Sequence, residues 1–208
     1  MGILPAMTDT ESKQPPRHLR MTEPSDWFIR HLPLIKPGGS VLDVAAGGGR
    51  HVRLFADAGH NVTAVDRETS ALNAFAGSHG AKIVEADLED GSPWPFIGET
   101  YDAISVCNYL YRPLMPAILG SLAPGGILLY ETFALGNEVY SKPRNPDHLL
   151  KSGELLELVQ DKLQVVAYAH GIVEGGECPG VKQMICAANN LSLSEREDGE
   201  PAPVAIPK

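Results

Sequence analysis

The sequence predicts an α/β fold with a doubly wound, mostly parallel sheet. Three apolar segments, residues 41–44, 61–66 and 82–88, have the length and composition of strands buried in such a sheet. Segments with apolar residues at helical spacing follow the first two, and this alternation implies parallel strands joined by right-handed crossovers. An acidic residue lies at or near the end of each strand, so three carboxylates are expected along one edge of the sheet.

Length and composition indicate one globular domain. The chain has 208 residues, of which 43% are hydrophobic and 21% are charged, and this suffices for one core of ordinary size. Proline-bearing sequence with little periodicity at both ends predicts a flexible arm over residues 1–22 and a disordered tail over 191–208. The folded domain is therefore expected over residues 23–190.

Composition also argues against several classes of protein. No apolar run approaches the roughly 18 residues of a membrane span, and the first residues lack the features of a signal peptide, so we expect a cytoplasmic protein without membrane association. Three cysteines without a C-x-x-C pair indicate neither a zinc site nor a disulfide framework, and no metal is expected. A formal net charge of −9 makes nucleic acid an unlikely partner.

A glycine-rich turn follows the first strand. Gly47 and Gly49 allow positive φ and a close approach of the backbone to a ligand, and the helix that starts near Arg50 points its first amides at an anionic group. A dinucleotide fingerprint G-x-G-x-x-G begun at Gly47 would need a third glycine where the chain has Val52. The turn therefore indicates a nucleotide-type ligand other than a dinucleotide.

The pattern acid-x-G-x-G-x-G, laid on Asp43, Ala45, Gly47 and Gly49, resembles motif I of the class I S-adenosylmethionine-dependent methyltransferases. Ala45 replaces the usual first glycine, which is the smallest change available. The resemblance implies a Rossmann-like sheet closed by a C-terminal antiparallel strand pair, with S-adenosyl-L-methionine as cofactor. In length and layout the chain is similar to the small bacterial methyltransferases that include the tellurite-resistance enzymes.

The resemblance also implies roles for individual residues. Asp43 would orient the methionine amino end of the cofactor, the glycines would accept its close approach, Asp66 would hold the ribose, and Asp87 with Leu88 would lie beside the adenine. The acid at the end of the second strand is also placed where a ribose-binding carboxylate is expected. The residues predicted to bind the cofactor are Asp43, Ala45, Gly47, Gly49, Asp66, Arg67, Asp87, Leu88, Cys107 and Asn108.

The remaining elements follow in order along the chain. Ser25 or Asp26 can cap a first helix, on which Trp27 is either a core residue or a cover for the ligand. His51, in the first turn of the helix after the glycine turn, is expected at the surface. Further helices are predicted over 50–58, 69–76, 114–122 and 152–161, and further strands over 101–107, 127–133, 163–169 and 181–187. The long polar insertion 136–148 lies between the fifth strand and the last helix and is typical of a lid.

The methyl acceptor is expected beside the end of the fourth strand, because ligands bind at the carboxyl ends of parallel strands. The predicted substrate-binding residues are Tyr109, Tyr111, Arg112 and Glu131. Two roles are open for Arg112: it steers an anionic acceptor, or it pairs with a carboxylate and is structural. The turn after the strand lacks the prolines of the Asn-Pro-Pro-aromatic motif that amine methylation of adenine or glutamine uses, and no catalytic residue is identified.

Three functions remain open on the sequence. The first is methyl transfer to a small molecule by alignment of the acceptor with the sulfonium methyl, for which no dedicated base is needed. The second is methylation of RNA or protein, and the third is a cofactor-binding regulatory module without turnover. The absence of an evident histidine and acid dyad favours the first. The sequence indicates no oligomeric state.

Overall fold

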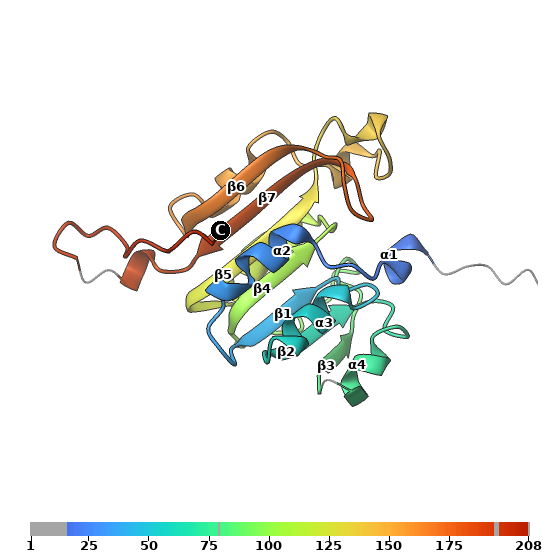
Figure 1. The fold of residues 1–208 in the computed structure, drawn as a ribbon, viewed down its shortest axis with the longest axis horizontal. Coiled ribbons are helices and arrows are strands. Elements are labelled where there is room, and N and C mark those ends of the chain that lie inside the picture. The colour runs from blue at the N-terminus through green and yellow to red at the C-terminus, as the bar shows by residue number, and fades with distance from the viewer. Residues whose placement is uncertain (1–15, 79, 194–195, 208) are drawn as a thin grey trace, which may run out of the picture.

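The computed structural model describes residues 16–78, 80–193 and 196–207, and these form a single sheet with helices on both faces (Figure 1). The strand order across the sheet is β3-β2-β1-β4-β5-β7-β6. The strands in the described residues are β1 (Ser40–Val44), β2 (Asn61–Asp66), β3 (Lys82–Glu85), β4 (Tyr101–Cys107), β5 (Leu122–Phe133), β6 (Gln164–Val173) and β7 (Gly180–Ala188).

The directions of the strands confirm the predicted fold class. β1 pairs in parallel with β2 and β4, and β3 and β5 extend this parallel part on either side. β7 lies antiparallel between β5 and β6, so the C-terminal strand pair closes the sheet as expected. The order reverses between β1 and β4, and such a switch point is where open α/β sheets bind ligands.

Helices cover the two faces and create two hydrophobic cores. Trp27, Phe28, Val52 and Phe55 from α2 and α3 pack on one face, which is turned to the viewer in Figure 1. Residues of α5 and α6 pack on the other face. The described helices are α1 (Arg17–Arg20), α2 (Asp26–His31), α3 (Arg50–Asp57), α4 (Asn73–Ser78), α5 (Met115–Gly120) and α6 (Glu154–Val159), with 3-10 turns η1 (Leu32–Leu34), η2 (Arg112–Leu114), η3 (Asn137–Val139), η4 (Pro146–His148) and η5 (Leu191–Leu193).

Some boundaries differ from those that the sequence predicts. β3 ends at Glu85. The Ala86 amide still donates to the Asp66 carbonyl at 3.0 Å, and beyond this bond the chain leaves the neighbouring strand β2. Asp87 therefore lies in a loop rather than in a strand. β5 begins at Leu122, five residues before the predicted start at Ile127, because Leu122 already pairs with Tyr101 of β4.

The segment that leads into α2 is held against the body of the domain. Residues 21–25, which we call the strap, follow α1 and precede α2. The Thr22 and Glu23 amides donate to Oε2 of Glu177 at 2.8 and 3.0 Å, and Arg53 donates to the Thr22 carbonyl at 2.6 Å. The first fifteen residues of the predicted arm lie outside the described part of the chain, and the flexibility expected of residues 1–22 stays a prediction.

Residues 191–193 and 196–207 contain only the turn η5 and otherwise no helix or strand. Val204 packs against the core formed by α2 and α3. The disorder expected of residues 191–208 stays a prediction. Among the described residues, no helix has the length and apolar character needed to cross a membrane.

Candidate active site

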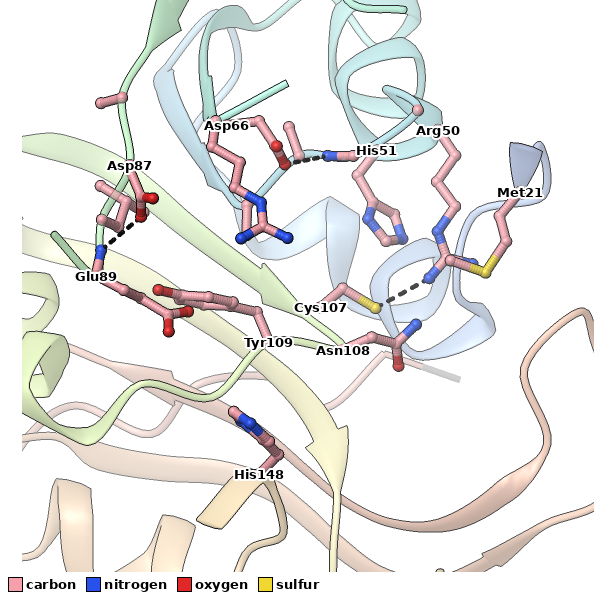
Figure 2. Close-up of a pocket in the computed structure, with 17 residues that line it drawn as sticks. Met21, Arg50, His51, Asp66, Asp87, Glu89, Cys107, Asn108, Tyr109 and His148 are labelled. Carbon is pink, nitrogen blue, oxygen red and sulfur yellow. Dashed lines mark hydrogen bonds between the residues drawn. The ribbon is translucent and has the colours of Figure 1, made fainter. Parts of the chain in front are cut away.

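A cavity of about 500 Å³ lies at the carboxyl ends of β1, β2 and β4 (Figure 2). Asp66, Asp87 and Glu89 lie toward one end of it, and Arg50 and Met21 lie toward the other. Residues at or just after the ends of the three apolar segments 41–44, 61–66 and 82–88 line this cavity, as the sequence predicts. Its lining consists of Met21, Ala45, Ala46, Gly47, Gly48, Arg50, His51, Asp66, Arg67, Ala86, Asp87, Leu88, Glu89, Cys107, Asn108, Tyr109 and His148.

The glycine turn forms one wall of this cavity. Ala45 and Gly47 both have positive φ, of 55° and 56°, so the backbone adopts the left-handed conformation that the motif predicts. The Gly47 amide donates to Oδ2 of Asp66 at 2.8 Å. This bond fixes the turn after β1 to the end of β2, and it aligns the backbone of the turn along the cavity.

Asp66 is held in place by the chain around it. Its Oδ1 accepts from the Glu68 amide at 3.0 Å, while its Oδ2 accepts from Gly47, and its exposed fraction is only 9%. Each carboxylate oxygen has a second lone pair for a further donor. Asp66 therefore presents a rigid, charged acceptor to the cavity, as binding of two ribose hydroxyls requires.

Asp87 and Leu88 lie on the loop that follows β3. Oδ1 of Asp87 accepts from the Glu89 amide at 2.9 Å, and this bond shapes the loop into a turn over the cavity. Tyr109, from the turn after β4, lies near Glu89 in Figure 2. This part of the cavity thus combines apolar surface from Leu88 and Tyr109 with the carboxylates of Asp87 and Glu89, and its chemistry suits an adenine ring with an exocyclic amine.

The end of β4 carries polar atoms that the protein itself leaves unsatisfied. Asn108 has a φ of 55°, and both its Oδ1 and its Nδ2 are buried without a hydrogen-bond partner. Buried amides are normally paired, and strained backbone clusters at functional sites. Because Asn108 lines the cavity, these two atoms fit a ligand with both donors and acceptors, such as an amino acid group.

One family of protein domains matches the part of the chain that forms most of this cavity. A family model described as a methyltransferase domain matches residues 41–126, which contain the glycine turn, Asp66, Asp87 and Asn108. This match covers less than half of the chain, and the fold of the described residues is similar to that of solved S-adenosylmethionine-dependent methyltransferases. Solved structures with this fold hold S-adenosylhomocysteine, the demethylated form of the cofactor that the resemblance of motif I implied.

Solved methyltransferases share the fold of the domain. TehB from Haemophilus influenzae has a TM-score of 0.68 and 19% identity, over 82% of this chain and 64% of TehB. A S-adenosylmethionine-dependent methyltransferase from Methanosarcina mazei has a TM-score of 0.60 and 16% identity, over 80% and 98% of the two chains. The enzyme 1,6-didemethyltoxoflavin-N1-methyltransferase from Burkholderia thailandensis has a TM-score of 0.57 and 21% identity, over 78% of this chain and 76% of that enzyme. No curated protein sequence matches the chain.

Asp43 does not lie on the wall of the methyltransferase cavity, although the resemblance implied that it orients the methionine end. It lies within β1, opposite Ser105 of β4, and the Ser105 hydroxyl donates to its Oδ1 at 2.5 Å. Burial raises the pKa of its carboxyl to about 7. No residue of β1 lines the cavity, whose wall at this point begins with Ala45. Asp43 therefore lies behind the glycine turn, within the sheet.

Gly49 is also absent from the cavity lining. It begins α3 with a φ of 81°, and a Cβ at this position would lie 2.4 Å from Cε2 of Phe75. Close packing between the turn and the ring of Phe75 therefore requires glycine here, rather than the approach of a ligand. The role of Gly49 in binding the cofactor stays a prediction.

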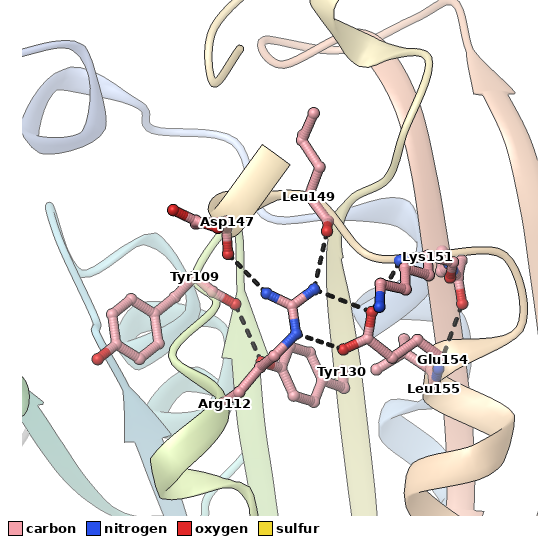
Figure 3. A network of polar contacts seen from close by, with 9 residues as sticks. Tyr109, Arg112, Tyr130, Asp147, Leu149, Lys151, Glu154 and Leu155 are labelled. Atoms are coloured by element: carbon pink, nitrogen blue, oxygen red, sulfur yellow. Dashed lines mark hydrogen bonds and ion pairs between the residues drawn. The ribbon is translucent and has the colours of Figure 1, made fainter. Parts of the chain in front are cut away.

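The predicted acceptor residues separate in the structure. Tyr109 lines the cavity, but Tyr111 does not, and neither does Arg112, whose Nε and Nη2 donate to the two oxygens of Glu154 at 2.6 and 2.9 Å (Figure 3). Arg112 also donates to the carbonyls of Asp147 and Leu149 at 2.7 and 2.9 Å. Of the two roles that the sequence left open for Arg112, this geometry favours the structural one.

Glu131 lies in β5 beside the end of β4, where its carbonyl accepts from the Asn108 amide at 2.8 Å, but its carboxylate is buried and bonds to other residues. Its Oε1 accepts from Nζ of Lys182 at 2.5 Å, and its Oε2 accepts from the Ser25 hydroxyl. It lines a second cavity, which does not include Tyr109 or Arg112. The structure thus does not bring Glu131 together with the other predicted acceptor residues.

Several lining residues were not predicted. His51 has an exposed fraction of only 2%, against the expected surface position, and its Nε2 accepts from the Ser25 amide at 3.1 Å. Burial lowers its pKa well below the usual range, so the imidazole is neutral. Arg50 and His51 follow the glycine turn directly, and that adjacency was the available signal. Met21 and His148 come from the strap and η4, and no local pattern marks them.

Proposed function

We propose that the protein transfers the methyl group of S-adenosylmethionine to a small-molecule acceptor. The observation that carries this proposal is the composition of the cavity. Its acidic end, with Asp66 and Asp87, suits the adenosine part of the cofactor, and the unpaired amide of Asn108 suits the methionine part. The space near Arg50 and Met21 is then left for the reacting end and its acceptor.

The side chains around the cavity support catalysis by alignment. When bound, the cofactor supplies a methyl group that is already strongly electrophilic. Burial raises the pKa of the Cys107 thiol, so this residue offers no thiolate, and the nitrogen Nε2 of neutral His51 is occupied by the Ser25 amide. Holding two reactants in a productive geometry is worth roughly 7–11 kcal/mol in principle, which suffices for an ionised or soft acceptor.

Size and charge favour a small acceptor over a macromolecule. The net charge of −9 opposes binding to a phosphate backbone, and the strap covers one end of the cavity. A structural neighbour is named as an enzyme for 1,6-didemethyltoxoflavin, and another is named for coclaurine; both names describe small molecules. Methylation of RNA or protein and cofactor binding without turnover are the competing functions.

Incubation with methyl-labelled S-adenosylmethionine tests the proposal. The wild-type protein is mixed in turn with a cell metabolite fraction below about 1 kDa, with total RNA and with a protein extract, and the label in each fraction is measured. We expect label in the metabolite fraction, and much less from Asp66→Ala at a cofactor concentration that does not saturate this variant. Label in RNA or protein alone would assign the second function, and no transfer to any fraction despite cofactor binding would assign the third.

A further inference from the structure

A second cavity, of about 440 Å³, lies between the strap, α2 and the turn that joins β6 to β7. Its apolar wall comes from the strap, α2, β6 and β7, which contribute Pro24, Trp27, Val173 and Met184. Arg50 is the residue that lines both this cavity and the cofactor cavity. The two cavities are therefore neighbours, and the guanidinium of Arg50 stands at their boundary.

Of the four acidic residues that line this second cavity, Glu23 and Asp26 are exposed, whereas Glu131 and Glu177 are engaged by other groups of the protein. Both oxygens of Glu131 accept bonds, one from Lys182 and one from Ser25. Glu177 accepts from the amides of the strap, and this holds its pKa below the usual range. These carboxylates are thus engaged in holding the strap and the buried lysine.

Two donors, in contrast, are left over. Arg50 has an exposed fraction of 9%, and it donates only to the Glu23 carbonyl at 2.8 Å and to Sγ of Cys107 at 3.1 Å. Within the described part of the chain no carboxylate forms a direct ion pair with Arg50, and the charges of Glu177 and Asp43 act on it only from a greater distance. Trp27, with an exposed fraction of 8%, has a buried indole N–H without an acceptor.

Unused donors of this kind indicate a missing acceptor. A buried guanidinium has five N–H groups, and leaving its charge unpaired costs free energy unless a ligand compensates it. Arginine and an indole N–H together match the oxygens of a carboxylate, and the apolar wall matches a hydrocarbon or aromatic body. Arg50 is thus placed for the binding of an anionic acceptor, which was one of the two roles that the sequence left open for Arg112.

We propose that the second cavity is the methyl-acceptor site, that it binds a small carboxylate with an apolar body, and that Arg50 and Trp27 bind its carboxylate. This inference rests on the proposed function, because it takes the first cavity as the cofactor site. The carboxylate holds the acceptor at the boundary between the two cavities. The alternative ligand of Arg50 and Trp27 is the methionine carboxylate of the cofactor. The experiment below distinguishes this carboxylate from that of the acceptor.

The test uses the full chain saturated with S-adenosylhomocysteine, and benzoate as the probe. The chain contains two tryptophans, so the indole N–H region of a nitrogen-correlated NMR spectrum holds two signals, which Trp27→Phe assigns. Trp94, whose indole N–H donates to the Ser121 hydroxyl at 2.9 Å, is the internal control. We expect benzoate to shift the Trp27 signal in a saturable way and to leave that of Trp94 in place, whereas the neutral benzamide binds at least about tenfold more weakly.

Matched variants assign the carboxylate to Arg50. Arg50→Gln is expected to weaken benzoate binding at least about tenfold, while its affinity for S-adenosylhomocysteine stays within about threefold of the wild-type value. Arg53→Gln is the control, because Arg53 lies one turn further along α3 and also bonds to the strap, but does not line either cavity. If Arg50→Gln does not fold, Trp27→Phe provides a second test. Because this variant lacks the indole signal, its benzoate affinity is measured by calorimetry beside that of the wild type, and a severalfold loss is expected.

Three results would overturn the inference. One is the absence of a saturable shift of the Trp27 signal, and another is equal benzoate affinity in Arg50→Gln. The third is a combination of two observations: Arg50→Gln loses affinity for S-adenosylhomocysteine, and benzoate competes with S-adenosylhomocysteine for the wild type. This result would show that Arg50 binds the methionine carboxylate of the cofactor. In all three, S-adenosylhomocysteine still binds the wild type. Failure of that binding would instead refute the proposed function.

Discussion

Asp66 connects the glycine turn to the cofactor cavity, and this gives a first prediction about a single side chain. Asp66→Ala should lower the affinity for S-adenosylhomocysteine at least about tenfold, because a hydrogen bond to a charged group is worth roughly 1.5–3 kcal/mol. Isothermal titration calorimetry measures this. Glu68→Ala is the control, since Glu68 is exposed and does not line the cavity. Unchanged affinity in Asp66→Ala would remove the ribose assignment.

Gly49 gives a second prediction at this scale, on stability. Gly49→Ala should lower the free energy of unfolding by roughly 2–4 kcal/mol, because a left-handed alanine costs about 1–2 kcal/mol and overpacking against Phe75 adds about as much. Urea unfolding measures it. In Gly59→Ala, φ is also positive but no atom lies within 4 Å of the added Cβ, so only the backbone cost should remain. Equal losses in both variants would show that contact with Phe75 is unimportant.

Among the elements, Arg112 joins the turn after β4 to η4 and the start of α6. Arg112→Ala should lower the free energy of unfolding by about 1–2 kcal/mol, because the ion pair with Glu154 is charge-assisted but partly exposed. Cofactor affinity should stay unchanged. Arg144→Ala, at an exposed arginine of the same insertion, should change neither quantity. A loss of cofactor affinity without loss of stability would contradict the structural role.

The elements also show what the sequence could predict. Strands β1, β2 and β3 are read from local apolar runs, and the predicted residues at or just after their ends, Ala45, Gly47, Asp66 and Asp87, line the cavity. The partner of Arg112 lies 42 residues away, and that of Ser25 lies 106 residues away. No local pattern encodes such pairs. The second cavity, formed by α2 and the β6–β7 turn, was hidden for the same reason.

At the scale of the whole molecule, stability should depend on pH through Asp43. Burial raises its pKa from 3.8 to about 7, so between these values the folded state holds a proton that the unfolded state has lost. The wild type should therefore lose stability relative to Asp43→Asn as pH rises from about 4 to 7, by roughly 4 kcal/mol in total, and the difference should level off above pH 7. Chemical unfolding of both proteins across this range measures it, and a constant difference would contradict a raised pKa.

The position of β7 has a consequence for how the chain folds. All residues that line the cofactor cavity come before Leu149, so they are synthesised before β6 and β7 exist. β7 must then enter between β5 and β6, and its contacts with β5 join distant parts of the chain, which are slow to form. We expect the cofactor half to organise first and strand insertion to limit the rate. Lys182 reaches Glu131 only in that last event, so the second cavity is completed at the end of folding.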